Sequence, residues 1–588
     1  KLTTAYTRRI FYFRPAADKA TGTLGNFNST GTDALTADEL ALFAGACSKT
    51  DVSARLFQCA GADSGKLTTL NSAANMVSYL RGQPVTGMRS RSQILGDVVN
   101  SSPVFVGKPS FSYKENGYAT WAAEKPQVDR TRILLVGGND GMLHAFRDSD
   151  GTEAWAYVPR LVMDKMYKLA DDNYRIKHQY FVDGTVTVAD VWDPTAGTIG
   201  ASGPSGAWRT IVVGGLGAGG RGFYALDITD TDNPKALWEL GPDQMPSGAS
   251  GQLGLSMGNP IVTKRADGSW IVALTSGYNN PTAGGYLFIV NALTGEVVKT
   301  IPTEDGGSNV GEGLTKINAW VESTSANLAL RFYGGDLKGQ LWRFDVDNLV
   351  EPKGKALLLA SFKSGESPRV AQPITTMPML AEFSANGGKR RVIYVGTGKY
   401  LGEPDVPSTT YPEHQQSIYA VVDELTSTGL GDVRGTTGAL VQQTIDKSVS
   451  PYVVGSTSTP VDWSKNKGWF VDLGLVKERV NIDMMMVANT LVAVGNVPGA
   501  SSTLCSAPDA NSAYLYMFNI MTGTGKVLAT GSMVAGLSAT EDPPVDGVPP
   551  GTISGLITTT KSGIVQPPIS VMTLSGQKPH RTSWRELY

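Results

Sequence analysis

Cysteine and histidine are scarce in this chain of 588 residues, which contains three cysteines and four histidines. Zinc and similar metals are usually held by Cys and His side chains at short, regular spacings. None of the histidines, His144, His178, His414 and His580, has such a spacing to a second His or to a Cys. The sequence therefore predicts no histidine metal centre.

Long apolar runs and an excess of one charge are also absent. No window holds 18 uninterrupted apolar residues, and the best candidate, 484–497, is interrupted by polar residues and glycine, so no membrane-spanning helix is expected. Lys plus Arg number 51 against 53 for Asp plus Glu, and only Arg89 and Arg91 form a small basic cluster. Without a larger basic surface, nucleic acid is not expected as a partner.

The few cysteines leave the redox compartment open. Cys47 and Cys59 flank a short polar loop and are the candidates for a disulfide, whereas Cys505 has no partner. Closing such a loop contributes about 2 to 3 kcal/mol in the chain-entropy model. Three free thiols in a reducing cell remain the alternative. The first residues, KLTTAYTRRIFYF, lack the apolar core of a signal peptide and suggest a mature product or a fragment.

What the chain has in abundance is glycine, 68 residues, arranged in a phrase that repeats. In the first copy an apolar run, 133–136, leads to glycines 137–138 and to an Asn-Asp-Gly sequence at 139–141 that suits a hairpin turn. Alternating apolar residues follow at 142–146, and Trp155 lies on a third strand. Each copy is therefore expected to form a small antiparallel meander.

The copies of this phrase predict the architecture. They lie near Gly214-Gly215, Ser276-Gly277, Gly334-Gly335, Gly396 and Gly495, and GWFVDLG at 468–474 is interpreted as a weaker copy. Four-stranded sheets that stack radially cover one another's faces. The sequence thus predicts an all-β fold, a seven-bladed β-propeller with long rim insertions, especially at 401–416 and 498–512.

Three segments are expected along the chain. Residues 1–92 form a helical and irregular preface, 93–574 form the propeller, and 575–588 form a C-terminal tail. Strand-like alternation at 551–574 is expected to complete the first or last blade and close the ring.

The preface carries two helix signals. Thr36 and Glu39 have the spacing of a capping box that opens a helix through Phe43. A second helix is expected to begin at Asn71 or Ser72 and to end near Gly82, because glycine often follows the last turn of a helix.

Acidic turns and glycine-rich loops are weak candidates for binding sites. Asp227, Asp230 and Asp232 offer oxygen ligands for calcium but do not fit the D-x-[DN]-x-[DN]-G pattern, so a turn-capping role is favoured. The GGLGAGGRG stretch at 214–222 lacks the Lys-Ser/Thr ending of a phosphate loop. No catalytic set of residues is recognised, and the protein is not expected to be an enzyme.

The repeat resembles that of quinone-cofactor dehydrogenases, in which ALD..TG....W phrases are common. That resemblance implies a quinone and calcium on one face of a propeller, often beside a disulfide between adjacent cysteines. Cys47 and Cys59 are not adjacent. A periplasmic quinoprotein-like dehydrogenase remains one alternative, and an outer-membrane assembly scaffold with a propeller fold is another.

A series of longer phrases is more specific. In chain order these phrases are MRSRSQILGDVVNSSPVFVG (88–107), VGGNDGMLHAF (136–146), YFVDGTVTVADVW (180–192), WRTIVVGGLGAGGRGFYALDIT (208–229), GGDLKGQLWRFDV (334–346), QPITTMP (372–378), YVGTGKYL (394–401) and SWREL (583–587). Together they resemble the C-terminal propeller of the PilY/PilC family of type IV pilus tip-associated proteins.

The resemblance implies an exported, non-enzymatic protein of the cell surface. Such a protein sits with minor pilins at the pilus tip, after passing through the periplasm and the outer membrane. It supports pilus assembly or opposes retraction, and it contributes to attachment to host or abiotic surfaces and to twitching motility.

This chain departs from the family at one position. Many members carry a D-x-D-x-D-G calcium loop just before the GGD strand, and the equivalent stretch here is WVESTSANLALRFYGGD at 320–336. Glu322 is its only carboxylate before Asp336, and calcium usually takes six to eight oxygen ligands. No calcium cofactor is therefore expected at this degenerate calcium loop, whose candidate ligands are Glu322, Ser323, Thr324, Ser325 and Asn327. The Arg-Gly-Asp sequence of some members is also missing.

Overall fold

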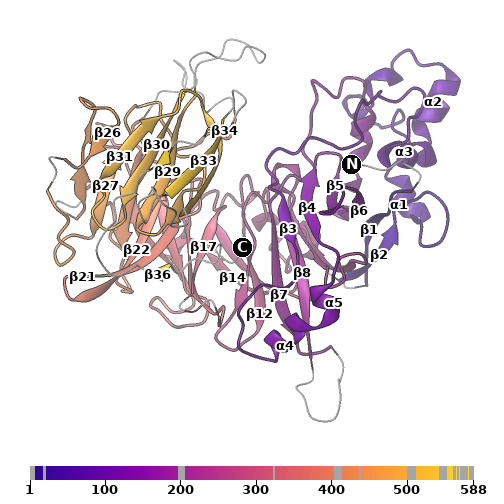
Figure 1. Ribbon diagram of the computed structural model, residues 1–588. Helices are drawn as coiled ribbons and strands as arrows, with labels where there is room; N and C mark the ends of the chain where they lie inside the picture. The colour runs from indigo at the N-terminus through magenta and orange to yellow at the C-terminus, as the bar shows by residue number, and fades with distance from the viewer. Residues whose placement is uncertain are drawn as a thin grey trace. The chain divides into compact units, whose positions relative to one another are not determined.

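The computed structural model divides into two compact units. It describes residues 7–17, 21–196, 206–321, 323, 325–402, 405, 414–435, 439–456, 459–498, 512–541, 553–559, 564–565, 568–569 and 580–581. The first unit comprises Lys1–Thr300, Thr324–Leu328 and Leu587–Tyr588, and the second comprises Ile301–Ser323 and Ala329–Glu586. Both units consist mainly of antiparallel sheets (Figure 1).

The preface contains the two expected helices and a third. Helix α1 (Ala37–Ala41) begins after Thr36, whose hydroxyl accepts a hydrogen bond from the Glu39 N–H, while the Glu39 carboxylate accepts one from the Thr36 N–H. This reciprocal pair is the predicted capping box. Helix α3 (Ala73–Leu80) begins after Ser72, again as predicted. Helix α2 (Ser64–Asn71), which precedes it, was not predicted.

The preface also supplies two strands to the first sheet. Strand β1 (Ile10–Pro15) pairs antiparallel with β2 (Gly22–Asn26) and parallel with β6 (Glu153–Val158), where Ile10 lies opposite Ala156. The helices gather beside β1 and β2 (Figure 1), and the core of the first sheet continues into them. Residues 10–15 and 22–26 thus extend the first sheet, although the sequence placed them outside the propeller.

The first unit contains three sheets, each built around the predicted meander. Their strand orders are β2-β1-β6-β5-β4-β3, β10-β9-β8-β7 and β11-β12-β13-β14. The remaining strands are β3 (Val104–Val106), β4 (Ile133–Gly138), β5 (Met142–Arg147), β7 (Val186–Asp193), β8 (Ala207–Gly215), β9 (Phe223–Asp227), β10 (Lys235–Leu240), β11 (Ile261–Lys264), β12 (Trp270–Thr275), β13 (Tyr286–Asn291) and β14 (Val297–Pro302), whose last two residues fall in the second unit.

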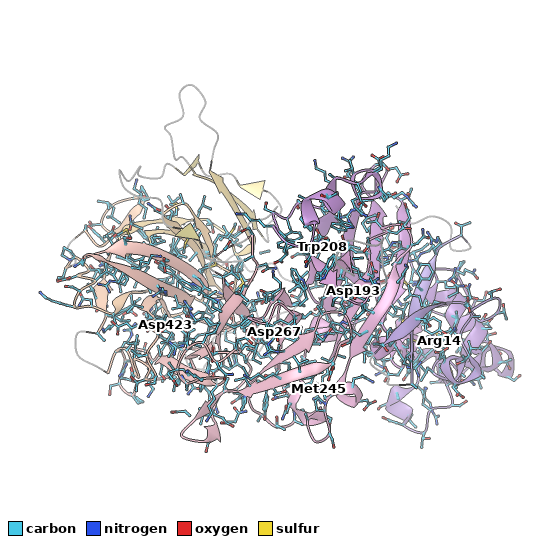
Figure 2. The ribbon with its side chains drawn as sticks, turned by 90° about the horizontal axis from the view of Figure 1, so that it is seen from below. Arg14, Asp193, Trp208, Met245, Asp267 and Asp423 are labelled. Atoms are coloured by element: carbon cyan, nitrogen blue, oxygen red, sulfur yellow. A yellow bond between two sulfur atoms is a disulfide. The ribbon has the colours of Figure 1, made fainter. Side chains whose placement is uncertain are left out.

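Short helices connect these strands. They are α4 (Tyr118–Ala123), α5 (Lys125–Val128), α6 (Arg160–Met163) and the 3-10 turns η1 (Val52–Ala54), η2 (Phe57–Cys59), η3 (Met166–Ala170), η4 (Gly217–Gly219), η5 (Pro242–Gln244) and η6 (Ser250–Gln252). The segment that carries α4 is held on the second sheet by aromatic contacts, including those of Tyr118 with Trp208 on β8, which Figure 2 labels. The Tyr118 hydroxyl also donates to the buried Asp190 carboxylate at 2.6 Å.

The first glycine phrase forms the hairpin that the sequence predicts. Strands β4 and β5 pair antiparallel, and Gly138 lies opposite Met142 across the turn. Gly141 has a φ of 93°, in the region that the turn requires and that glycine adopts without a steric penalty. Trp155 lies on β6, which pairs with β5. The predicted order of strand, turn, strand, turn and third strand is confirmed.

The second unit contains three further meanders. Their orders are β17-β18-β19-β20, β24-β27-β23-β22-β21-β36 and β25-β26-β31-β30-β29-β28. The strands are β17 (Ile317–Val321), β18 (Ala329–Gly335), β19 (Gln340–Phe344), β20 (Ala356–Ser361), β21 (Met379–Ala385), β22 (Gly388–Gly396), β23 (Ser417–Val422), β24 (Val441–Gln443), β25 (Ile445–Asp446), β26 (Tyr452–Val454), β27 (Gly468–Asp472), β28 (Met485–Val487), β29 (Thr490–Val497), β30 (Ser512–Asn519), β31 (Gly525–Ala529) and β36 (His580–Arg581), with a small hairpin of β15 (Glu304–Asp305) and β16 (Ser308–Asn309).

One predicted repeat is corrected by this pairing. GWFVDLG at 468–474 is not a separate weak copy, because β27 pairs antiparallel with β23 as the fourth strand of the sheet that β21 begins. An apolar run between glycines fits the last strand of a meander as well as its first. Seven sheets of four to six strands are present in the described part of the chain, one of them formed by strands near its end, and a blade count of seven stays a prediction.

The strands near the end of the chain form a separate sheet. Strand β33 (Ile553–Thr559) pairs with β32 (Val534–Glu541), β34 (Ile564–Val565) and β35 (Pro568–Ile569) in a sheet of their own. The described strands of 551–574 add no strand to the first sheet or to the other meanders, and the closure of the ring by this segment stays a prediction. An alternating pattern identifies a strand but not its partner. Within the expected tail, β36 pairs with β21.

A recurrent tryptophan contact joins successive sheets within each unit. The indole N–H of Trp155 donates to the Thr231 carbonyl, that of Trp238 to the Ala292 carbonyl and that of Trp469 to the Ile520 carbonyl, at 2.8, 2.9 and 3.1 Å. Each tryptophan lies on the fourth strand of a meander, and each acceptor lies in the turn between the third and fourth strands of the next.

The tryptophan contact explains why the repeated phrase contains both Trp and Gly. A buried indole N–H needs an acceptor, and the turn that provides it must approach the ring closely. Gly295, with a φ of 75°, would place an added Cβ 2.7 Å from Trp238, and Gly523, with a φ of 69°, would place one 2.6 Å from Trp469. Glycine satisfies both the backbone angle and the close approach.

Candidate functional site

The predicted disulfide is present in the first unit. Cys47 and Cys59 are joined, with their Cα atoms 5.4 Å apart, a separation within the usual range for a disulfide. Their bridge closes the loop that contains η1 and links it to η2. Cys505, which the sequence left without a partner, lies outside the described residues.

The three acidic turn residues do not converge on one point. Asp227 lies 2.6 Å from Arg209 and accepts hydrogen bonds from the Thr229 N–H and hydroxyl. Asp230 accepts from the Asp232 N–H, and the Asp232 carboxylate pairs with Arg147 at 2.9 Å. Turn caps and ion pairs therefore account for these carboxylates, in agreement with the role that the sequence favoured.

The degenerate calcium loop is described only in part, since Glu322 and Thr324 lie outside the described residues. Asn327 is buried with a φ of 47°. Its amide donates to the Tyr113 hydroxyl at 3.2 Å and accepts from the Thr263 hydroxyl at 3.2 Å. The Asn327 side chain thus anchors the loop within the first unit.

Asp336, at the end of this stretch, also has a structural role. Its carboxylate accepts hydrogen bonds from the Trp342 indole at 2.8 Å and from the N–H groups of Lys338 and Gln340. Burial raises the pKa of Asp336 to about 6, although these hydrogen bonds oppose the rise. Asp336 therefore caps the turn that leads from β18 to β19.

A buried network of charges, which the sequence did not indicate, crosses the first sheet. Arg8 donates to both oxygens of Glu153, from Nε at 2.6 Å and from Nη2 at 2.8 Å. His144 lies between two carboxylates, with Nδ1 2.8 Å from Glu153 and Nε2 3.0 Å from Asp140. All four side chains are at most 5 % exposed.

The network fixes the charge of its histidine. Burial alone would lower the pKa of His144, but the charge of Asp140 and the hydrogen bonds to Asp140 and Glu153 outweigh it and raise the pKa to about 9. The pKa of Glu153 is lowered, because its hydrogen bonds to His144 and Arg8 outweigh burial. His144 is therefore protonated at neutral pH, and two cations face two anions.

Another buried pair lies in the second unit. Arg343 donates to Asp423, which Figure 2 labels, and each of the two side chains is 1 % exposed. Asp423 also accepts from the Tyr333 hydroxyl at 2.6 Å. Because Arg343 lies on β19 and Asp423 directly follows β23, this buried pair joins two successive sheets.

A polar cavity of about 270 Å³ opens next to the buried network of the first unit. Its lining residues belong to the phrase before the first hairpin, to the hairpin turn and to the segment around η3: residues 89–97, Asn139, Asp140, Leu169 and Tyr174. The Asn139 N–H donates to the Asp97 carbonyl at 3.0 Å, and the Arg89 N–H donates to the Ala170 carbonyl at 3.1 Å. These bonds hold residues 89–97 across the end of the first sheet.

The sequence indicated only part of this cavity. Arg89 and Arg91 were noted as a basic cluster too small for nucleic acid, and Asp140 was assigned to a hairpin turn. Nothing in the local pattern showed that the phrase and the turn meet, because that contact joins residues more than 40 positions apart in the chain, such as Asn139 and Asp97.

The described part of the chain contains no metal-binding cluster and no membrane-spanning helix. Across the described ranges, no three His, Cys, Asp or Glu side chains lie close enough together to hold a metal ion. In that same part of the chain, no helix is long and apolar enough to cross a membrane.

Comparison with known proteins gives a consistent result over most of the chain. Residues 95–457 match the family model of the PilY1 beta-propeller domain. A type IV pilus biogenesis factor PilY1 homolog of Xylella fastidiosa is 31 % identical over 563 residues, covering 89 % of this chain and 42 % of that protein. The type IV pilus biogenesis factor PilY1 of Pseudomonas aeruginosa PAO1 is 32 % identical over 469 residues, covering 72 % of this chain and 38 % of that protein.

A solved structure extends the similarity to three dimensions. The crystal structure of the Pseudomonas aeruginosa PilY1 C-terminal domain has a TM-score of 0.56 and 25 % identity, with 79 % of this chain and 99 % of that chain covered. The chain spans about two fifths of the length of the curated relatives. The predicted all-β propeller class and the PilY/PilC resemblance are confirmed, and the chain belongs to the PilY1 β-propeller family.

Proposed function

We propose that this chain is the propeller region of a type IV pilus biogenesis factor. The observation that carries the proposal is the 31 % identity to a type IV pilus biogenesis factor PilY1 homolog over 89 % of the chain. Family-level fold alone does not determine function. Here, however, the similar proteins are named for one process and match nearly the whole chain.

The finer proposal is that the protein acts by contact and not by catalysis. It binds minor pilins at the pilus tip, supports pilus assembly or opposes retraction, and contributes to surface attachment and twitching. It does so outside the cell, with no resident cofactor. Stacked meanders suit this role, because tension on the chain is shared among many backbone hydrogen bonds, such as the eight residue pairs between β29 and β30.

The test measures surface piliation and the binding of minor pilins in variants of one parent strain. The segment that encodes these 588 residues is deleted in frame from the chromosomal gene, and surface pili and twitching zones are measured. A tagged full-length protein is used to co-purify minor pilins. We expect loss of surface pili in the deletion strain and recovery of minor pilins with the tagged protein. Normal piliation in the deletion strain would refute the proposed function.

A further inference from the structure

The cavity in the first unit presents two guanidinium groups whose faces are already covered. The Arg89 guanidinium lies 4.7 Å from the centroid of the Tyr174 ring, and that of Arg91 lies 4.0 Å from the centroid of the Tyr79 ring. Such stacking leaves the edges of the guanidinium plane, which carry its N–H donors, available for an oxyanion.

Most of these donors remain unused. Arg89 donates from Nε to the Leu169 carbonyl at 2.8 Å, and Arg91 donates from Nη2 to the Tyr79 carbonyl. Among the residues that the structure describes, no carboxylate lies within 4.0 Å of either guanidinium. Burial lowers the pKa of Arg91, although its interactions with Tyr79 and with the charge of Asp140 oppose the shift.

The two acids that line the cavity already have donors of their own. Asp97 accepts from the Asn139 amide at 3.0 Å and lies 3.0 Å from His178 Nε2. Asp140 lies 3.0 Å from His144 through Oδ1. Among the described residues, the two arginines are therefore the cations of the lining that form no salt bridge.

One acceptor in the lining remains open. The Oδ2 atom of Asp140 is buried and has no hydrogen-bond partner among the described residues. A buried acceptor without a donor is costly, and the cost is relieved by a donor on a ligand. The cavity thus offers N–H donors to an anion and one oxygen to an N–H group.

Exposed apolar residues adjoin the lining residues along the chain, and these neighbours are here called the rim. Val98 and Val99, which follow the lining residue Asp97, are 41 % and 52 % exposed. Ile176 is 79 % exposed, and Tyr180, whose ring centroid lies 5.0 Å from that of His178, is 37 % exposed. Exposed apolar side chains next to a polar site favour contact with a protein over contact with a small ion.

We propose that this cavity binds the carboxyl terminus of a partner polypeptide whose last residue is apolar. The terminal carboxylate lies between Arg89 and Arg91, the N–H of the last residue donates to Asp140, and the apolar side chain lies on the rim. The volume of about 270 Å³ is small for a cofactor and sufficient for a chain end. The inference rests on the proposed function only in taking the partner to be a protein.

The first experiment uses N-acetyl-leucine, which has the carboxylate, the N–H and the apolar side chain of a chain end. Its affinity for the purified chain is measured by ligand-observed NMR beside that of N-acetyl-leucinamide, acetate and inorganic phosphate. We expect N-acetyl-leucine to bind at least about tenfold more tightly than its amide, because the amide lacks the charge that the arginines pair with. Equal affinity for the two, or no binding of either, would overturn the proposal. Tighter binding of phosphate would replace the peptide with a phosphate ligand.

The second experiment uses variants of the lining. Arg89→Gln removes one donor pair, and Ser92→Glu places a negative charge in the cavity at an exposed lining residue. Both are expected to weaken N-acetyl-leucine binding at least about tenfold. Arg175→Gln, at an exposed arginine that does not line the cavity, is the matched control and should bind as the wild type does.

Stability does not obscure the outcome. If Arg89→Gln does not fold, the Ser92→Glu variant tests the proposal alone. Ser92 is exposed, so its replacement is expected to leave the fold intact. A folded Ser92→Glu variant with wild-type affinity would overturn the proposal. The cavity proposal and the proposed pilus function can fail separately. If the protein does not bind N-acetyl-leucine but minor pilins still co-purify with it, only the cavity proposal is refuted.

Discussion

Replacing Glu153 by Gln tests the buried charge network directly. Glu153 neutralises Arg8 through two hydrogen bonds, at 2.6 and 2.8 Å, and His144 through a third at 2.8 Å. Its side chain is 1 % exposed. Glutamine keeps the size of the side chain, so no cavity forms. The change removes one negative charge and leaves two buried cations facing Asp140 alone.

The magnitude follows from the burial of these charges. Removing one partner of a buried ion pair costs about 3 to 5 kcal/mol, because the other charge remains buried without compensation. If His144 loses its proton, this cost becomes smaller, but the ion pair between His144 and Asp140 is lost as well. Since domains are typically stable by about 5 to 15 kcal/mol, Glu153→Gln is expected to remove a large part of the stability of the first unit.

Urea unfolding at pH 7, followed by circular dichroism and tryptophan fluorescence, measures this loss. The chain has two units, so the earlier transition is analysed separately from the later one. Glu124→Gln, the same chemical change at an exposed residue, is the control and should change the free energy of unfolding by less than about 0.5 kcal/mol. A Glu153→Gln effect below about 1 kcal/mol would refute the reasoning.

The pH dependence gives the same network a second test. The pKa of His144 is raised from 6.5 to about 9 in the folded protein. Its contribution is therefore fully present below pH 6.5 and is lost as the pH rises through 9, by about 3 kcal/mol at 1.36 kcal/mol for each pKa unit. In Glu153→Gln this decline should still begin near pH 6.5 but should end at a lower pH and be smaller, because His144 has lost one acceptor and its folded-state pKa is less raised. A wild-type stability that is flat between pH 7 and 10 would contradict this charge assignment.

Three further predictions concern the fold and the loops. Gly295→Ala places a Cβ 2.7 Å from Trp238 at a φ of 75° and should lower the melting temperature. Gly268→Ala is the control, because its φ is 83° but its Cβ meets nothing within 4 Å, and it should lower the melting temperature less. Equal losses would show that close packing on the indole is unimportant. Reducing the Cys47–Cys59 disulfide should destabilise the first unit by about 3 kcal/mol, and an unchanged melting temperature in reductant would oppose this. Millimolar calcium should shift the melting temperature by less than about 1 °C, because the degenerate calcium loop offers few charged ligands, and a larger, chelator-reversible shift would disprove this.

Local patterns in the sequence were sufficient where the chain folds on itself over short distances. The hairpin at 139–141, the capping box at Thr36 and the disulfide each depend on residues at most about a dozen positions apart. Turn residues, capping spacings and a closed loop carry their own stereochemical requirements. These features could therefore be predicted without knowledge of the rest of the fold.

Pairing over long distances could not be predicted in this way. The apolar run at 468–472 has the composition of a strand, yet its place as the fourth strand of an existing sheet depends on β23, nearly fifty residues earlier. The same holds for β33, which pairs with β32, and for β1, which joins β6. Alternation specifies a strand and its buried face, but many edges would accept it.

The sequence by itself determined the repeated meander, the propeller class and the family, because these reside in residue types at fixed spacings. Only the tertiary structure decided which charged side chains are buried together and which lie in a cavity without a salt-bridge partner. Arg8, His144, Asp140 and Glu153 form one neutral network, whereas Arg89 and Arg91 line a cavity and form no salt bridge among the described residues. The physical reason is that electrostatic interactions depend on separation in space and on burial, and neither can be read from positions in the chain.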